Sequence, residues 1–370
     1  MVGATGLPRS FHLMSTGNPQ SDSTRNPGVR ARIGAIVAGL THLYMAGLIV
    51  LLLALEWWGE RNWLLSLAIY APPQILLAPL ALLAPVALLV RPRLLLWYGL
   101  CAVVVAFGYM TFRVQSRPVL DKKGLVVVTH NVGEGNRQQF ISFLEAENPD
   151  VIALQDARFR GVDYASRFRD RYVVANGEFC LISRHLIQQS KILEAPKWHG
   201  RPVAARYEII CDGQPLIIYN VHMPTPRGQF NHVLSRRFVR DLFAEDEGGA
   251  PAGSYREWID SRIQLARELA RVFAAEKQPF IACGDFNMPD HGFIYHLFAS
   301  EMTDAFAHAG RGWGLTFPGE TRNPTAFFGP WLRLDFAFAG RGWEPVFCAP
   351  ESGRKSQHCA VVANFVPALP

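Results

Sequence analysis

Polar residues able to do chemistry recur in this sequence at the ends of short apolar runs. There are six such blocks, in the order Thr129-His130-Asn131, Gln155-Asp156, Asn220-Val221-His222, Gly284-Asp285-Phe286-Asn287, Arg333-Leu334-Asp335 and Ser356-Gln357-His358. Strand ends and the loops after them are where α/β proteins place functional groups. Carboxylates and amides suit hard divalent cations, and histidine exchanges protons near neutral pH. The residue types therefore indicate metal-assisted or acid–base chemistry.

Each block alone also has a structural explanation. Gly284-Asp285-Phe286-Asn287 suits a turn, because Gly, Asp and Asn favour turn conformations. His222 could be a hydrogen-bonded histidine at a strand end. Asp156 and Asp335 are harder to explain in this way, because each belongs to an apolar run and a buried carboxylate needs a partner. The functional argument therefore rests on the whole series and its order.

Taken together, the blocks resemble the endonuclease/exonuclease/phosphatase superfamily, which has the deoxyribonuclease I-like fold. The resemblance covers residues 124–367, and Gly284–Asn287 and Asn220–His222 are its most specific parts. It implies an α/β (α+β) four-layer sandwich of two mixed β-sheets flanked by helices, with the site at one end of the sandwich. It also implies a divalent-metal-dependent phosphoric ester hydrolase, similar to a phosphodiesterase or nuclease.

The resemblance assigns catalytic roles to five residues. Asp285 matches the carboxylate that orients or deprotonates the attacking water, and Asn287 matches a donor to the phosphate. His222 and His358 match the pair that contacts the phosphate and transfers protons. Asp335 resembles the carboxylate partner of the last histidine, which fixes the tautomer of that ring.

The metal and substrate positions follow the family with two departures. Asn131 and Asp156 match metal ligands for Mg²⁺, with Mn²⁺ as a substitute, and Asn220 matches a substrate-binding amide. The family usually has Glu at the position of Asp156 and Asp at the position of Gln357. Both changes weaken metal binding in principle, so a non-catalytic or repurposed membrane-bound binding module on the same fold is the alternative.

Short apolar runs and amphipathic patterns after residue 124 predict the elements that position these residues. Two helices are predicted, Arg137–Glu147 and Tyr255–Lys277, and the second has one apolar face. The predicted strands are Leu125–Thr129, Val151–Leu154, Phe179–Ser183, Ala204–Ile210, Pro215–Val221, Pro279–Cys283, Leu332–Ala339 and Ala360–Phe365.

The first part of the chain has a different composition. Residues 1–32 are rich in Gly, Ser, Pro, Asn and Arg, which predicts a disordered tail. Three stretches then contain no Asp, Glu, Lys or Arg: Ile33–Leu55, Asn62–Val90 and Leu94–Phe112. They are long enough for transmembrane helices. The predicted organisation is a tail (1–32), an anchor of three transmembrane helices (33–112), a linker (113–123) and a catalytic domain (124–367).

The charge distribution predicts an orientation. Arginines in the tail and after the second stretch place both in the cytoplasm and the catalytic domain outside it. Arg113, Arg117, Lys122 and Lys123 argue for the opposite orientation. The chain is then an integral, multi-pass membrane protein, and the lipid bilayer is its partner through residues 33–112. A transporter or channel subunit has little support, because the stretches contain no acid or basic residue that could serve a transport path.

The composition also limits the partners. The net charge of +6 comes mostly from residues before position 113, so the catalytic part lacks the basic surface of a tight duplex binder. The substrate is expected to be a phosphate ester in nucleic acid, in a phospholipid head group or in a small phosphodiester. Attachment to a bilayer favours lipid, and no protein partner is predicted. The six cysteines form no Cys-x-x-Cys pair and are expected to be small buried hydrophobes, with a Cys180–Cys211 disulfide left open.

Overall fold

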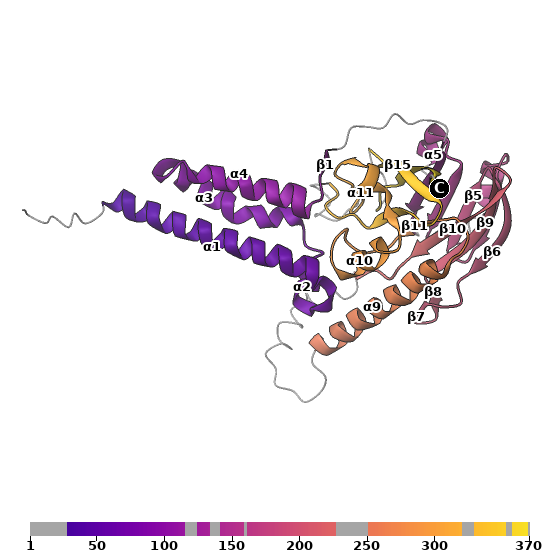
Figure 1. The fold of residues 1–370 in the computed structure, drawn as a ribbon, viewed down its shortest axis with the longest axis horizontal. Coiled ribbons are helices and arrows are strands. Elements are labelled where there is room, and N and C mark those ends of the chain that lie inside the picture. Colours follow the sequence, from indigo (N-terminus) through magenta and orange to yellow (C-terminus); the bar gives the residue numbers. More distant parts are fainter. Residues whose placement is uncertain are drawn as a thin grey trace, which may run out of the picture.

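A bundle of helices joins a larger α/β domain in the computed structural model (Figure 1). The structure describes residues 28–114, 124–133, 141–158, 161–226, 251–319, 329–352 and 357–368. Most of the predicted tail, most of the predicted linker and the start of the predicted helix Arg137–Glu147 lie outside these residues. The α/β domain contains two six-stranded mixed sheets, which confirms the predicted fold class for this part of the chain.

The first sheet places Asn131 beside Asp156. Parallel pairing of β2 and β3 aligns Asn131 with Gln155, the residue before Asp156. Both side chains therefore emerge at the same end of the sheet. The strand order is β15 (Trp343–Pro350), β16 (Val361–Pro367), β2 (Leu125–Asn131), β3 (Val151–Gln155), β5 (Phe179–Ser183) and β4 (Tyr172–Asn176).

The second sheet brings three predicted catalytic residues into register. Parallel pairing of β10 and β11 aligns His222 with Asp285, and antiparallel pairing of β11 and β14 aligns Asp285 with Asp335. The strand order is β12 (Thr303–Asp304), β14 (Asp335–Ala339), β11 (Phe280–Asp285), β10 (Gln214–His222), β9 (Ala204–Cys211) and β6 (Leu186–Ile192).

Three apolar layers hold the domain together. The two sheets pack face to face through a cluster that includes Val127, Ile209 and Ile281. The amphipathic helix α9 (Pro251–Ala275) and the short helix α10 (Phe293–Ala299) cover the outer face of the second sheet. Helices α5 (Ile141–Glu147) and α6 (Gly161–Arg167) cover the first sheet. The result is the four-layer sandwich, and all eight predicted strands are present in it.

Gly284 allows β10 and β11 to meet closely just before Asp285. Its φ of +147° is unusual for residues with a side chain, and a Cβ there would overlap the carbonyl oxygen of Val221 on β10. Any larger residue must push β10 and β11 apart just where His222 and Asp285 leave the sheet. The glycine of the Gly-Asp-Phe-Asn block is therefore a packing requirement.

The first part of the chain forms a helical unit, residues 29–109. Two of its helices are long and apolar enough to cross a membrane by length and composition: α1 (Val29–Trp57) and Pro73–Val90, which comprises the 3₁₀ turn η2 (Pro73–Leu77) and α3 (Ala78–Val90). The third candidate, Leu94–Tyr109, is shorter and comprises α4 (Leu94–Val103) and the π-helical turn η3 (Val104–Tyr109). The three spanning helices predicted from sequence thus correspond to two of sufficient length.

The predicted stretch Asn62–Val90 is not one helix. The short helix α2 (Trp63–Ala68) ends before Pro72 and Pro73, and the next helical segment begins at Pro73. Proline lacks an amide hydrogen and disfavours helical backbone at the preceding residue, which explains the break. The segment that includes the 3₁₀ turn η1 (Gly59–Arg61) and α2 packs on the α/β domain.

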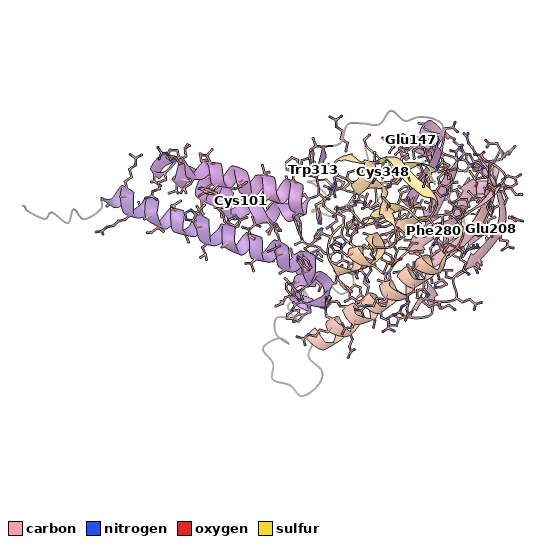
Figure 2. The ribbon with its side chains drawn as sticks, viewed as in Figure 1. Cys101, Glu147, Glu208, Phe280, Trp313 and Cys348 are labelled. Carbon is pink, nitrogen blue, oxygen red and sulfur yellow. The ribbon has the colours of Figure 1, made fainter. Side chains whose placement is uncertain are left out.

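The bundle has two distinct ends. At one end, Arg30 donates to Leu89 O at 2.8 Å, and the Arg91 side chain packs against Gly34. The other end contacts the α/β domain, where β1 (Arg113–Val114) pairs with β13 (Arg311–Gly312). Figure 2 shows Cys101 within the bundle and Trp313 at this junction. All six cysteines are unbonded and buried, so the Cys180–Cys211 disulfide is not formed.

Candidate active site

Two histidines from different sheets meet at one carboxylate oxygen. The Nε2 atoms of His222 and His358 each lie 3.8 Å from Asp285 Oδ2. Asn131 Nδ2 donates to this same oxygen at 2.8 Å. Asp285 itself is only 1% exposed. Residues more than two hundred positions apart in the sequence thus converge at the end of the sandwich where β2, β10 and β11 finish.

His358 has a buried carboxylate partner. Its Nδ1 donates a hydrogen bond to Asp335 Oδ2 at 2.9 Å, which leaves Nε2 facing Asp285. The hydroxyl oxygen of Thr316 accepts hydrogen bonds from the amides of Leu334 and Asp335 and fixes the start of β14. Burial raises the pKa of the Asp335 carboxyl, and the nearby Asp285 raises it further against the opposing effect of His358. This pair was predicted from the sequence.

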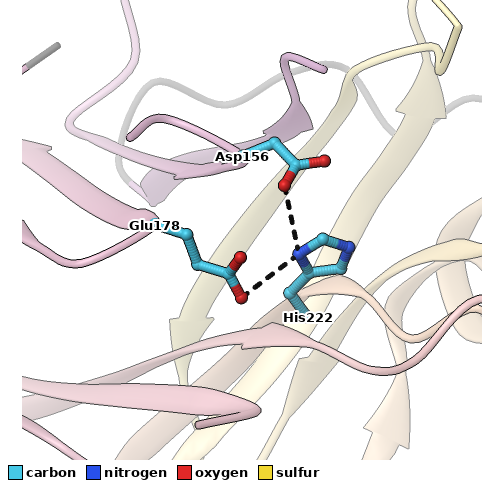
Figure 3. A group of neighbouring side chains, drawn as sticks. All are labelled: Asp156, Glu178 and His222. Carbon is cyan, nitrogen blue, oxygen red and sulfur yellow. Dashed lines mark ion pairs between the residues drawn. The ribbon is translucent and has the colours of Figure 1, made fainter. Parts of the chain in front are cut away.

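His222 lies between two other carboxylates (Figure 3). Its Nδ1 is 3.5 Å from Glu178 Oε1 and 3.8 Å from Asp156 Oδ1. Burial lowers the pKa of His222, but the hydrogen bond to Glu178 and the charges of Asp285, Glu178 and Asp156 outweigh it, so the net pKa is raised. The protonated imidazolium therefore persists to higher pH than in an ordinary histidine.

Glu178 is a site residue that the sequence analysis did not identify. It lies in the turn between β4 and β5, is 5% exposed, and accepts a hydrogen bond from Arg201 Nε at 3.1 Å. Burial acts to raise its pKa, but His222 and Arg201 bring the pKa down to about 2. The available signal was a carboxylate directly before the apolar run Phe179–Ser183. Arg201, whose side chain is 44% exposed, also lies 3.7 Å from Asp156.

The donor set fits a hard divalent cation. Two groups, Asp156, Glu178, His222 and Asp285, Asp335, His358, each bring ligand atoms within 4.8 Å of one another. The contact between His222 and Asp285 links the two groups. Four carboxylates therefore lie around two imidazoles and Arg201. Such an oxygen-rich, negatively charged cluster is what Mg²⁺ or Mn²⁺ requires. Asn131 Oδ1 also accepts from Gly133 N at 3.0 Å, which orients the amide.

Backbone conformation explains the aspartate at position 156. Asp156 has a φ of +53°, in the left-handed region that Asp and Asn tolerate better than longer side chains. Its side chain is 19% exposed, compared with 5% for Glu178. A short carboxylate on a left-handed backbone and a longer one from the neighbouring turn thus face the same imidazole. Gln357, the second departure from the family pattern, is exposed, and its carbonyl accepts from Gly319 N.

The two predicted phosphate donors already have protein partners. Asn287 donates from Nδ2 to Met223 O at 2.8 Å, and its amide donates to Asp285 Oδ1 at 2.9 Å. Asn220 is fully buried between the sheets, where it donates to Leu154 O and accepts from Gln155 Nε2. Asn287 therefore belongs to the cluster around Asp285, and Asn220 lies in a polar bridge beneath it. Donation to a phosphate by either amide stays a prediction.

Three solved structures are similar to this chain over about two thirds of its length. A humanized TDP2 from D. rerio has 15% identity and a TM-score of 0.44 over 66% of this chain and 99% of its own. A Bacteroides thetaiotaomicron mannosyl-6-phosphatase has 15% identity and a TM-score of 0.46 over 65% of this chain and 99% of its own. A 3'-5' exonuclease from Neisseria meningitidis has 14% identity and a TM-score of 0.45 over 65% of this chain and 99% of its own. No curated protein matches the chain.

The family assignment comes from the sequence itself. Residues 128–358 match the Endonuclease/Exonuclease/phosphatase family. That range includes every predicted site residue from Asn131 to His358 and more than half of the chain. With its two six-stranded sheets and its paired histidines around one carboxylate, this chain belongs to the endonuclease/exonuclease/phosphatase family.

Proposed function

We propose that this chain is a membrane-anchored phosphoric ester hydrolase that depends on Mg²⁺, with Mn²⁺ as a substitute. One observation carries the proposal: the Nε2 atoms of His222 and His358 lie at equal distances of 3.8 Å from Asp285 Oδ2. Each imidazole also has a carboxylate at its Nδ1. Hydrolysis of a phosphate ester needs one group to activate water and another to protonate the leaving oxygen. This arrangement supplies both.

The roles follow from the hydrogen bonds of each group. Asp285 has one oxygen fixed by the Asn287 amide and the other facing both imidazoles, so it orients the water and takes its proton. The raised pKa of His222 makes it the better proton donor at neutral pH. The Asp335–His358 pair keeps a ring nitrogen directed at the phosphate. Asn131 and Asp156, with Glu178 beside them, would hold the metal, which neutralises charge on the phosphate oxygens.

Glu178 favours the enzyme over the non-catalytic binding module. The alternative was motivated by Asp156, which is one methylene shorter than the usual glutamate, and by the neutral Gln357, which removes one negative charge from the site. Glu178 adds a buried carboxylate whose pKa of about 2 keeps it charged at neutral pH. A site that retains this charge together with both imidazoles has the groups that hydrolysis needs.

Two features of the helical unit support attachment to a membrane and a location of the α/β domain outside the cytoplasm. Only 22% of the apolar part of α1 and 17% of that of Pro73–Val90 are covered by protein, whereas a helix in a soluble core would be mostly covered. We propose α1, Pro73–Val90 and Leu94–Tyr109 as three spans. Arg30 and Arg91 lie at the bundle end away from the α/β domain, so the positive-inside rule places that end in the cytoplasm.

Substrate choice is the part that the fold does not determine. Nucleic acid, a phospholipid head group and a small phosphodiester all carry the required ester. A pocket beside the site is lined by Arg158, Glu178 and Arg201 among others, which suits an anionic group. Attachment to a bilayer raises the local concentration of lipid substrates and favours the phospholipid.

The test is an assay of the full chain in detergent micelles. We expect hydrolysis of bis-p-nitrophenyl phosphate with Mg²⁺ or Mn²⁺, loss of activity with a chelator, and loss in Asp285→Ala and His358→Ala at an unchanged melting temperature. No turnover with either metal would support the binding module instead. A panel of single-stranded DNA, phospholipid vesicles and sugar phosphates then separates the substrate classes.

A further inference from the structure

The helical unit reaches the backbone of the active site. Tyr70 lies just after α2, and its hydroxyl donates to the carbonyl oxygen of Asn287 at 2.9 Å. Arg262 on α9 donates both to this carbonyl and to the Tyr70 hydroxyl. The Arg262 guanidinium stacks 5.7 Å from the Tyr70 ring, and Arg262 is only 1% exposed. Tyr70, which lies between the two apolar helices α1 and Pro73–Val90, is therefore hydrogen-bonded to Asn287 in the cluster around Asp285.

Asn287 is held from several sides in a left-handed conformation. Its φ of +49° lies in the region that Asn adopts more readily than most residues. The backbone amide of Asn287 donates to Asp285 Oδ1 and Asn131 Nδ2 donates to Asp285 Oδ2, so the two donors together orient this carboxylate. Tyr70 and Arg262 hold the carbonyl side of Asn287, and Met223 O holds its side chain. The helical unit therefore contacts the residue whose backbone amide holds Asp285 Oδ1.

A second contact fixes the end of the same loop. The buried carboxylate of Glu60 accepts hydrogen bonds from the amides of Phe293 at 2.8 Å and Ile294 at 3.4 Å. Gly292 has a φ of +90°, and a Cβ there would lie 2.8 Å from Glu60 Oε2. A Cβ on Gly59 would lie 3.1 Å from Gly292 Cα, so the two backbones are in direct contact. Both ends of the loop 286–292 are thus held by residues 59–70.

Apolar packing reaches the other histidine. Leu55, Ile69 and Tyr70 of the helical unit form one cluster with Leu332 and Leu334, and Phe317 packs against it. The Phe317 ring lies 5.0 Å from the His358 ring. The helical unit therefore supports both flanks of the site, through a hydrogen bond on the Asp285 side and through packing on the His358 side.

We propose that the helical unit is part of the active-site scaffold and that Tyr70 is a positioning residue, which acts through Asn287 on Asp285. The membrane anchor would then set the turnover rate as well as the location of the enzyme. The kinetic part of this inference rests on the proposed hydrolase function. The structural part, that Tyr70 restrains the loop 286–292, does not.

The matched pair Tyr70→Phe and Ser66→Ala tests the proposal in the full chain in detergent. Both changes remove one hydroxyl of the helical unit that contacts the α/β domain, since Ser66 Oγ lies 3.0 Å from Tyr255 Oη. Of these two hydroxyls, only that of Tyr70 is hydrogen-bonded to the loop after Asp285. Phenylalanine keeps the ring against Arg262. We expect Tyr70→Phe to lower kcat about tenfold at unchanged KM, because one hydrogen bond to the Asn287 carbonyl is lost, and Ser66→Ala to keep the wild-type kcat.

Hydrogen exchange of the peptides that cover residues 285–293 gives a readout independent of turnover. Faster exchange there in Tyr70→Phe, with Ser66→Ala like the wild type, supports the proposal even if no substrate is hydrolysed, which would refute the proposed function alone. An active wild type with kcat and exchange unchanged in Tyr70→Phe overturns the proposal. Equal losses of kcat in both variants, in proportion to their melting temperatures, also overturn it, because they would reflect docking in general.

Discussion

The two histidines of the site are equivalent in distance to Asp285 but differ in their support. The Asp335 side chain that faces His358 is fully buried, and burial raises its pKa. Glu178, which faces His222, is shared with Arg201 and has a pKa of about 2. His358 thus has a dedicated partner at 2.9 Å, and His222 has a shared one at 3.5 Å next to a second carboxylate, Asp156.

This difference separates orientation from charge. A short hydrogen bond between buried groups fixes a ring and its tautomer. Several permanently charged carboxylates mainly stabilise a positive charge, either on the imidazolium or on a metal. We therefore propose that His358 is held in a fixed orientation toward the substrate. We propose that His222 donates the proton and that the carboxylates beside it, Asp156 and Glu178, would hold the metal. The predictions below test this division.

The largest effect is expected for Asp285→Asn, because both histidines and Asn131 face this carboxylate. We expect kcat to fall by about 10³-fold or more, with the fold retained since the amide is of equal size. The His222 pKa should also fall, because Asp285 is one of the charges that raise it. Initial rates and NMR titration of the imidazole check both points. A loss of kcat of less than tenfold would contradict the role of Asp285 as the group on which both histidines act.

Asp335→Asn should be the next most damaging change. An amide at this position offers a donor where His358 Nδ1 donates, so the ring loses its orientation and kcat falls by about 10²- to 10³-fold. Asp304→Asn is the control, because Asp304 is a buried carboxylate on the neighbouring strand β12 that pairs with Arg333. It should lower the melting temperature and preserve kcat. Equal kinetic losses in the two variants would contradict a specific role for Asp335.

Glu178→Gln should have a smaller effect and change the pH dependence. Arg201 and Asp156 remain near His222, so we expect a loss of kcat of about tenfold. Glu178 raises the His222 pKa, and its neutralisation therefore lowers that pKa. A proton donor loses activity as pH rises through its pKa, so the alkaline limb of the pH–rate profile should move to lower pH. A limb that stays in place or moves to higher pH would exclude His222 as the donor.

Asp156→Glu is expected to have the smallest effect. Glu178 already supplies a longer carboxylate beside this position, and the left-handed backbone at Asp156 disfavours glutamate. The Mg²⁺ concentration for half-maximal activity should therefore change by less than about threefold. Titration of activity with Mg²⁺ measures it. An increase in apparent metal affinity of more than tenfold would show that Asp156 is a weakened ligand and that Glu178 does not compensate for it.

The sequence was sufficient for eight strands of the two sheets and for the polar residues at their ends, and the edge strands β4, β6, β12 and β15 were not predicted. Apolar runs such as Val151–Leu154 and Pro215–Val221 appear as β3 and β10, because buried strands are read from local composition. Register then places His222 and Asp335 beside Asp285. The contacts of Glu178 could not be predicted in this way. A glutamate in a glycine-containing turn looks like an exposed residue, and its contact with His222 joins the two sheets, which local composition does not reveal.

The helical unit shows a different limit. A segment that faces lipid and a segment that is buried against protein have similar amino-acid compositions. The stretch Asn62–Val90 was therefore predicted as a single transmembrane helix. In the structure its first part covers the α/β domain through Ile69 and Tyr70, and only Pro73–Val90 is long enough to span. Hydropathy measures how unfavourable it is to expose a side chain to water. It does not distinguish burial in a lipid bilayer from burial against the α/β domain.

The contacts of residues 59–70 also impose an order on the synthesis of this protein. Tyr70 leaves the ribosome 217 residues before Asn287, and Glu60 leaves it 233 residues before Phe293. Residues 59–70 must therefore wait, with the Glu60 carboxylate unpartnered by these amides, until β11 and α10 have been translated. Completion of the candidate site is thereby tied to the synthesis of the last third of the chain.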